Sequence, residues 1–164
     1  MRLSSHVYWF GCVLGCVALP AIATASPRAE SRLSSTKTPE GRPEVHLDRL
    51  DFPQDVAGSR ELRVHLERVL KKEVRRVEWG AGRDNRIEYR FSVTKLDLAV
   101  NGDVVEVSCT ALGALPGGRT AKSQLTFGGA ASEQQRVIKQ VLEIVARGVI
   151  TRLAQLERRR RGLD

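Results

Sequence analysis

Apolar and polar residues alternate along the middle of this chain. From Ile87 to Val93 every second residue is apolar, which is the pattern of a strand with one buried face. The apolar positions then shift by one residue over Leu96–Val100. A shift of this kind indicates that one extra residue is inserted into the strand, so we expect a β-bulge near Lys95.

Turn residues divide this region into three strands. Asn101-Gly102 favours a tight hairpin, because both residues tolerate positive φ. A second strand is expected over Val104–Leu112, with Cys109 on its apolar and therefore buried side. A third strand is expected over Ala121–Phe127, after the turn at Pro116–Gly118, and Gly128-Gly129 is expected to break it.

Two amphipathic helices flank the three strands. The first is predicted over Ser59–Val77, with Ser59 as its N-cap; its apolar stripe has three- and four-residue spacings and includes Leu62, Leu66, Val69 and Leu70. The second begins with Ser132–Gln135, whose sequence SEQQ matches a capping box. Its apolar stripe extends from Val137 to Leu156 and ends in the cations Arg158–Arg161.

The order of these elements predicts the class of fold. A first strand is indicated by alternation over Glu44–Leu50. Helices with one apolar stripe must cover the apolar face of the sheet. We therefore expect an α+β two-layer sandwich in the order β-α-β-β-β-α. Its sheet would be a mainly antiparallel meander of three or four strands with both helices on one face, and the folded domain would cover residues 44–157.

The first 25 residues have the pattern of an export signal. Arg2 is followed by the apolar run Val7–Ala23 and then by the small residues around Ala25. This pattern predicts a signal peptide over residues 1–25, cleaved between Ala25 and Ser26. Residues 26–43 lack apolar periodicity and are rich in Ser, Thr, Pro and charged residues, so we interpret them as a disordered linker.

Two other interpretations of the N-terminus remain open. The apolar run is about as long as the ~20 residues that an uncleaved membrane anchor needs. The segment Val13–Cys16 also resembles a lipobox, in which Cys16 would carry the lipid, although Leu14 departs from the small residue usual there. Cleavage after Ala25 would leave Cys109 as the single cysteine, so the mature monomer would have no internal disulfide.

The chain of 164 residues has a formal net charge of +8, or +8 − 1 = +7 once Arg2 is removed. A basic balance favours anionic partners such as a polymer or lipid head groups. Arg158–Arg161 could contact such an anion through their guanidinium groups, or residues 158–164 could be a solvated tail that complements the helix dipole. Nucleic acid is a disfavoured partner for an exported protein.

No motif predicts a cofactor or a catalytic centre. Gly113–Thr120 is one residue from a P-loop, but a strand follows it where a phosphate-binding helix is required, so we interpret it as a β-turn. His46, His65 and Cys109 lack the spacing of zinc ligands, and the cluster Asp48–Asp55 does not have the spacing of a calcium loop.

The order and sizes of the elements resemble small periplasmic domains of Gram-negative bacteria. The resemblance rests on YRFSVTKLDL (Tyr89–Leu98), VVEVSCTAL (Val104–Leu112) and the long last helix. It is a resemblance to the lipopolysaccharide-assembly lipoproteins and the penicillin-binding-protein activator lipoproteins. It implies a small domain of the cell envelope, and no functional residue of those families matches a position in this chain.

These observations lead to one main hypothesis and one alternative. The main hypothesis is a non-enzymatic exported envelope protein, periplasmic or secreted and tethered to a membrane if it is a lipoprotein. It would bind a partner protein of the envelope through the polar sheet face or a sheet edge. The alternative is a binder of anionic envelope polymer or lipid through the arginine-rich C-terminus and the basic helix face. An enzyme is disfavoured, because no set of residues supports one.

Overall fold

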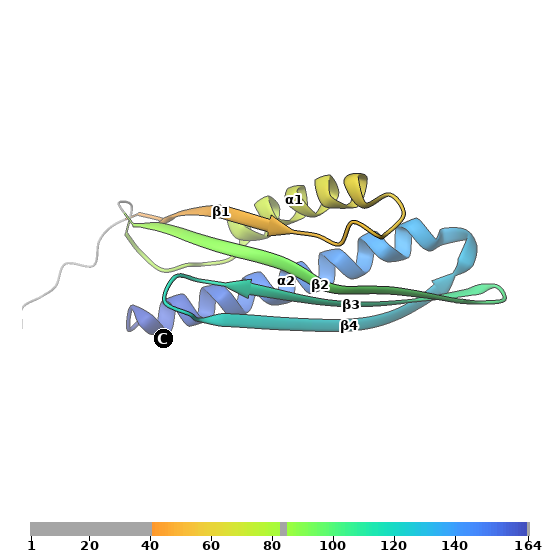
Figure 1. The fold of residues 1–164 in the computed structure, drawn as a ribbon. Coiled ribbons are helices and arrows are strands. Elements are labelled where there is room, and N and C mark those ends of the chain that lie inside the picture. The colour runs from red at the N-terminus through yellow and green to blue at the C-terminus, as the bar shows by residue number, and fades with distance from the viewer. Residues whose placement is uncertain (1–40, 83–84, 164) are drawn as a thin grey trace, which may run out of the picture. The chain divides into compact units, whose positions relative to one another are not determined.

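The computed structural model describes residues 41–82 and 85–163. The predicted signal peptide, Cys16, the cleavage site at Ala25-Ser26 and most of the predicted linker lie outside these residues. The elements follow the predicted order (Figure 1) and are β1 (Glu44–Asp51), α1 (Ser59–Arg76), β2 (Arg86–Asn101), β3 (Val104–Ala114), β4 (Thr120–Ala130), the 3-10 helix η1 (Ala131–Glu133) and α2 (Gln134–Arg160). The α+β class and the order β-α-β-β-β-α are confirmed.

The four strands form one mixed sheet in the order β1-β2-β3-β4. β1 pairs with β2 in parallel, and the other two pairs are antiparallel. The β2–β3 register shifts between Val93 and Lys95, so the predicted bulge is confirmed, and it explains why the apolar positions change parity there. The hairpin that follows closes at Gly102, whose φ of 59° is in the left-handed region.

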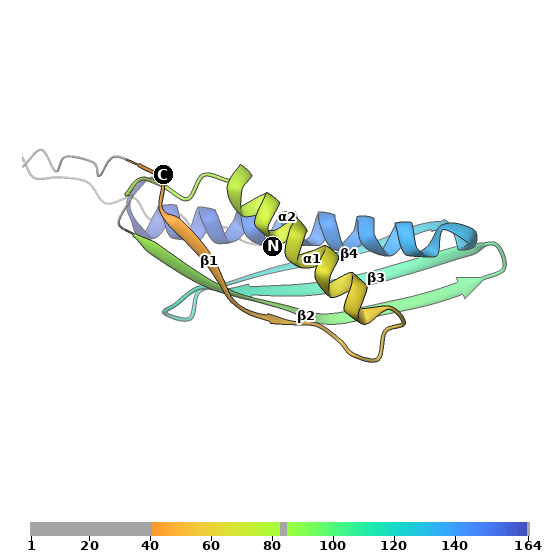
Figure 2. The same ribbon diagram turned by 90° about the horizontal axis from the view of Figure 1, so that it is seen from above.

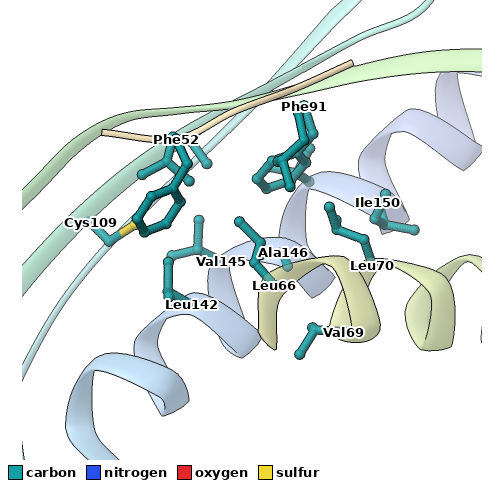
Figure 3. Packing of buried hydrophobic residues seen from close by; sticks show 14 of the residues in the cluster. Phe52, Leu66, Val69, Leu70, Phe91, Cys109, Leu142, Val145, Ala146 and Ile150 are labelled. Carbon is teal, nitrogen blue, oxygen red and sulfur yellow. The ribbon is translucent and has the colours of Figure 1, made fainter. Parts of the chain in front are cut away.

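Both helices lie on the same face of the sheet (Figure 2). Phe52 and Phe91 come from the sheet side of the core, Leu66 and Leu70 from α1, and Leu142 and Ile150 from α2 (Figure 3). Cys109 is fully buried in this layer, as predicted. On the other face of the sheet, alternate strand residues such as Glu88, Thr94 and Glu106 are exposed, so the sheet has one covered and one uncovered face.

Both predicted helix caps are wrong. Gly58, with a φ of 75°, precedes α1, and its carbonyl accepts the first helical hydrogen bond from Leu62; Ser59 is already helical. The predicted capping box at Ser132 fails because β4 continues to Ala130 and Ala131 N still donates to Asp103 O. The chain therefore leaves the sheet too late for Ser132 to cap a helix, and a 3-10 turn precedes α2.

The prediction that Gly128-Gly129 breaks the last strand is also wrong. β4 continues through both glycines, with Gly129 opposite Val105 and Ala130 opposite Val104. Gly129 is needed for close packing, since a Cβ atom there would lie 2.5 Å from Val137 Cγ2. Gly129 thus lets the strand lie close to α2, and both glycines leave the pairing with β3 intact.

The described chain enters and leaves the domain at the same end. Because β1 and β2 are parallel, Glu44 lies beside Arg86 at the start of both strands. The carbonyl of Gly41 accepts a hydrogen bond from Gly82 N at 2.8 Å. The C-terminus of α2 reaches the same loop, where Arg161 Nη1 donates to Ala81 O at 3.0 Å.

Candidate functional site

The four C-terminal arginines predicted as an anion contact lie at the end of α2. Three of them are helical, because α2 extends to Arg160. Arg160 Nη2 lies 2.6 Å and Arg161 Nε 2.9 Å from Oε1 of Glu157. Arg158 Nη2 donates to the carbonyl of Leu163 at 3.3 Å. Arg160 and Arg161 therefore both pair with the buried carboxylate of Glu157, although the side chain of Arg160 is 51% exposed.

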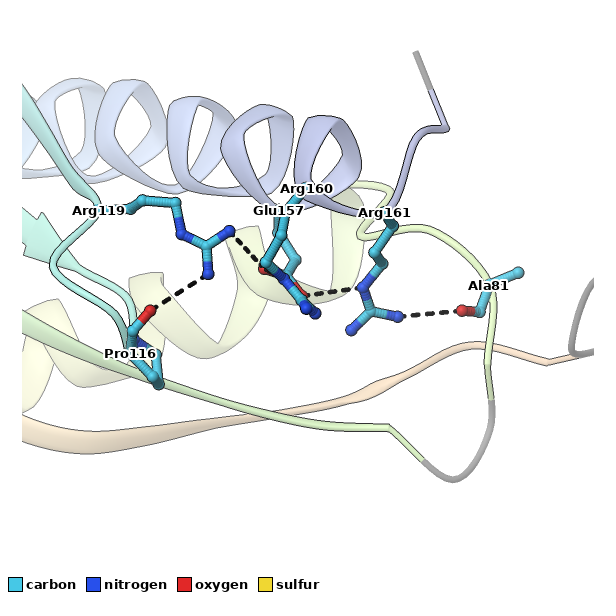
Figure 4. A network of polar contacts seen from close by, with 6 residues as sticks. All are labelled: Ala81, Pro116, Arg119, Glu157, Arg160 and Arg161. Carbon is cyan, nitrogen blue, oxygen red and sulfur yellow. Dashed lines mark hydrogen bonds and ion pairs between the residues drawn. The ribbon is translucent and has the colours of Figure 1, made fainter.

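Glu157 is the centre of this network (Figure 4). Only 3% of the residue is exposed, and its Oε2 also lies 3.7 Å from Nη1 of Arg119 in the β3–β4 turn. Burial raises the pKa of the Glu157 carboxyl, but the hydrogen bonds and the positive charges of Arg160 and Arg161 together lower it more, so that the pKa lies below its usual value. The network joins the end of α2 to the β3–β4 turn and, through Ala81, to the α1–β2 loop.

A second buried carboxylate links the two helices. Glu73 of α1 is 4% exposed, and its oxygens lie 3.3 Å from Arg76 Nη1 and 3.5 Å from Arg147 Nε of α2. His65 Nε2 of α1 lies 3.2 Å from Oε1 of Glu143, also on α2. The acidic residues of the helices are thus mostly directed inward or toward the neighbouring helix, and the cations outward.

The exposed surfaces of the two helices are strongly basic. Among the exposed charged residues of α1 and α2, twelve are basic and one, Glu61, is acidic. The basic residues are Arg60, Arg63, Arg68, Lys71, Lys72, Arg75, Arg76, Arg136, Arg147, Arg152, Arg159 and Arg160. We call this surface, with the exposed Val64 and Ile144 that lie on it, the basic helical face.

The strands have a balanced surface. Their exposed charged residues are five basic (Arg49, Arg86, Arg90, Lys95 and Lys122) and five acidic (Glu44, Asp48, Glu88, Asp97 and Glu106). Many of these are paired with one another, with distances of 3.0 Å for Arg90–Asp48, 3.1 Å for Arg86–Glu88 and 2.6 Å for Lys95–Asp97. The excess of positive charge on the secondary structure is therefore confined to the helices.

β4 is an edge strand of the sheet. Leu115 N donates to Arg119 O and Ala131 N to Asp103 O, so the odd-numbered residues of β4 are the ones that bond to β3. The backbone groups of the even-numbered residues point away from the sheet. One of them, the carbonyl of Lys122, accepts a hydrogen bond from Arg152 of α2. From Gln124 to Ala130, the structure gives these outward groups no partner among the residues it describes.

The remaining candidates from the sequence do not form a site. His46 and His65 lie on β1 and α1, each beside a glutamate, and Cys109 is buried in the core, where desolvation raises the pKa of its thiol to about 12. Within residues 41–82 and 85–163, no three His, Cys, Asp or Glu residues are grouped to hold a metal ion. No helix in the same residues is long and apolar enough to cross a membrane.

The P-loop-like segment is a turn between strands, as interpreted from the sequence. β3 ends at Ala114 and β4 begins at Thr120, with Gly117 and Gly118 at φ values of 82° and 79°. A hollow of about 460 Å³ lies beside this turn, and Asp48, Glu88 and Arg90 are among its lining residues. The charges in the hollow are mixed, and Arg90 is paired with Asp48, so no single ligand charge is favoured there.

The basic helical face was only partly foreseen from the sequence. The two helices contain many cations in any case, but the sequence pattern does not reveal that Glu73 and Glu157 are buried. The signal that could have found them is their position on the apolar stripes: Glu73 is four residues after Val69, and Glu157 is four after Leu153. A carboxylate on an apolar stripe indicates a buried ion pair.

No protein-family model matches this chain, and neither does any curated protein. The chain is similar in structure to rare lipoprotein B from Shewanella oneidensis, at 12% identity over 74% of this chain and 99% of the other, with a TM-score of 0.48. A minor lipoprotein from Acinetobacter baumannii is 16% identical over 75% and 96% of the two chains, with a TM-score of 0.34. A Xanthomonas campestris protein of the family DUF330 is 9% identical over 79% and 93%, with a TM-score of 0.39. Two of these three are lipoproteins by name, none is named as an enzyme, and the identities are too low to carry a functional residue over.

Proposed function

We propose that this chain is a non-enzymatic, exported protein of the bacterial cell envelope that binds a partner protein through the edge of strand β4. The observation that carries the proposal is the row of outward backbone groups from Gln124 to Ala130. Export is supported by the pattern of the first 25 residues, with Arg2 followed by the apolar run Val7–Ala23.

The chemistry of the β4 edge suits an extended peptide. An edge strand offers alternating N–H and C=O groups that a partner strand can pair with. The segment Gln124–Ala130 contains no charged residue and no proline, and the side chain of Phe127, on the covered side of the sheet, is 40% exposed. A partner strand with an apolar residue next to Phe127 would gain both the backbone pairing and apolar burial.

The buried titratable groups support a non-enzymatic role. Glu73 and Glu157 are each held by arginines, and the Cys109 thiol has a pKa raised to about 12 by burial. Burial also raises the pKa of Tyr89, which packs against Trp79. These groups stabilise the core or its rim: Tyr89 and Glu157 border surface hollows, but only 2% and 3% of these residues are exposed.

The test depends on the backbone N–H of Gln124, which points outward from the edge of β4 and is available to a partner strand. A photo-crosslinking amino acid at Gln124 is expected to capture a protein partner in cells, whereas the same residue at Glu106, on the uncovered face of β3, is not. Gln124→Pro removes an outward N–H without affecting the ladder to β3 and should abolish co-purification of the captured partner. Gln124→Ala, which keeps the N–H, should leave it unchanged; equal co-purification of both variants would overturn the proposal.

A second candidate function is binding of an anionic envelope polymer or lipid. The observation that favours it is the ratio of twelve basic to one acidic residue on the exposed sides of the helices. Of the C-terminal arginines, Arg159 and Arg160 are among these twelve residues, and Arg160 and Arg161 also contact Glu157. Binding to immobilised polyphosphate or to anionic vesicles should then fall as salt rises; failure of both probes to bind at low salt would exclude it.

A further inference from the structure

The basic helical face is a surface with few counter-charges of its own. Five of its exposed cations have neither an ion pair nor a side-chain hydrogen bond to any residue that the structure describes: Arg60, Arg68, Lys71, Lys72 and Arg75. Most carboxylates of the two helices are buried or half-buried and already paired, as Glu73 is with Arg76 and Arg147. A concentration of cations of this kind is neutralised most readily by an external anionic surface.

A groove between the helices gives this face a place for an anionic group. It has a volume of about 470 Å³ and is lined by Arg60, Arg68 and the half-buried Lys139 together with Glu61, Val64 and His65. The three cations come from both helices, so an anion there would contact α1 and α2 together. The side chain of Val64 is 41% exposed beside these cations.

The composition of the face indicates how deeply it would enter a bilayer. Helices that lie on a membrane surface combine cations with apolar residues on the membrane side. Here each helix has one exposed large apolar residue: Val64 on α1 and Ile144 on α2, both 41% exposed. Two aliphatic side chains bury little area, so attraction between charges must dominate, and the protein would rest on the head groups without deep insertion.

The spread of the cations favours a surface over a single small anion. α1 has 18 residues and α2 has 27, so the helices are about 27 Å and about 40 Å long. The exposed cations occur from Arg60 to Arg76 on α1 and from Arg136 to Arg160 on α2. A layer of lipid phosphates can meet many of these charges at once.

We propose that the basic helical face docks on the head-group layer of an anionic phospholipid bilayer, with the α1–α2 groove holding a lipid phosphate. This inference rests on the second candidate function and names its ligand and its surface. It places α1 and α2 against the membrane and turns the uncovered face of the sheet toward water. The edge of β4 remains at the side, where it is accessible to a protein.

Two triple variants of the full chain test the proposal. R68A/K71A/R75A removes three cations from the basic helical face, and alanine favours helix there. R86A/R90A/K95A removes three cations from the sheet and is the matched control, because it changes the net charge equally. Both keep the same N-terminus, so any binding through that segment is shared. Circular dichroism and thermal melting establish that each variant is folded.

Binding is measured by co-sedimentation with vesicles of phosphatidylcholine containing phosphatidylglycerol, and with pure phosphatidylcholine vesicles. The helix variant should bind the anionic vesicles on the order of a hundredfold more weakly than the parent chain, since each of the three cations near the surface contributes about a fivefold factor. The sheet variant should bind like the parent. Raising the ionic strength from about 0.01 M to about 1 M should release the parent chain, because the Debye length falls from about 30 Å to about 3 Å.

Four outcomes would overturn the proposal. Equal loss of binding in both variants would show that only net charge matters, and equal binding of the parent to neutral vesicles would show that the cations are not the cause. Binding to soluble polyphosphate without binding to vesicles would assign the face to a polymer; the second candidate function would then survive. Absence of binding to either probe would exclude that function as well.

Discussion

The Nε atom of Arg161 lies 2.9 Å from Oε1 of Glu157, one turn earlier on the same helix. This contact fixes the arginine so that its Nη1 atom reaches the carbonyl of Ala81 in the α1–β2 loop. A charged pair at the end of one helix thus connects that helix to a loop 80 residues away in the sequence. The end of α2 is therefore held against the α1–β2 loop by this contact.

Glu157→Ala should destabilise the domain by about 3 kcal/mol, because it leaves Arg119, Arg160 and Arg161 without their buried carboxylate. Chemical denaturation monitored by circular dichroism gives the free energy of unfolding. The control is Glu133→Ala, which breaks the exposed pair with Arg136 and should cost less than about 0.5 kcal/mol. Equal losses in the two variants would contradict a structural role for the Glu157 network.

The same carboxylate should make stability depend on pH in the acid range. The pKa of Glu157 is lower in the folded protein than the usual value, which is about 4.3 for an unfolded chain. Its contribution is therefore fully present above about pH 4.3 and is lost as the pH falls through the lower folded pKa. Unfolding free energies measured from pH 7 to pH 3 should decrease less steeply in Glu157→Gln than in the parent chain. Parallel profiles would contradict the lowered pKa.

Gly113→Ala should destabilise the domain by about 1–3 kcal/mol through overpacking. A Cβ atom at this position would lie 2.5 Å from Val149 Cγ1 and 2.7 Å from Leu153 Cδ1, both on α2. Gly128→Ala is the matched control on the neighbouring strand, because its Cβ would meet nothing closer than Val105 O at 3.7 Å; it should change stability by less than about 0.5 kcal/mol. Thermal melting of both variants measures this difference in stability. A Gly113→Ala variant as stable as the parent chain would show that α2 can move away from β3.

The thiol of Cys109 should be unreactive in the folded protein. It is fully buried, and its pKa is raised to about 12 by desolvation, so the reactive thiolate is scarce at pH 8. In a chain with Cys12→Ser and Cys16→Ser, iodoacetamide should label Cys109 only after denaturant is added. Labelling is followed by mass spectrometry. Rapid labelling without denaturant would indicate that the hydrophobic core between the sheet and the helices opens readily.

The strands and helices could be predicted because each has a buried face that recurs with its own period. The alternation over Ile87–Val93 and the change of parity at Lys95 identified both a strand and its bulge. The helix starts could not be predicted from local motifs. The start of α2 depends on how far β4 stays paired with β3, and this pairing overrode the capping box at Ser132 and the glycine pair before it.

The candidate surfaces were harder to predict, since they depend on residues far apart in sequence. Arg90 pairs with Asp48 across the parallel strands, 42 positions away, and this pairing helps to keep the sheet surface balanced. The direction of the backbone groups on β4 follows from its register with β3, which no property of Gln124 or Thr126 alone reveals. Net charge indicated an anionic partner, but only the fold separates a basic face from a balanced one.

The parallel pairing of β1 with β2 has a consequence for chain connectivity. Gly41 contacts Gly82 and Arg161 contacts Ala81, so the first and last described segments touch neighbouring residues of one loop. A short linker could join them, and the chain could be cut at the Gly102 turn, where a Cβ atom would meet nothing within 4 Å. Such a circular permutant should keep the sandwich, because the order in which the elements are synthesised is not needed to hold them together.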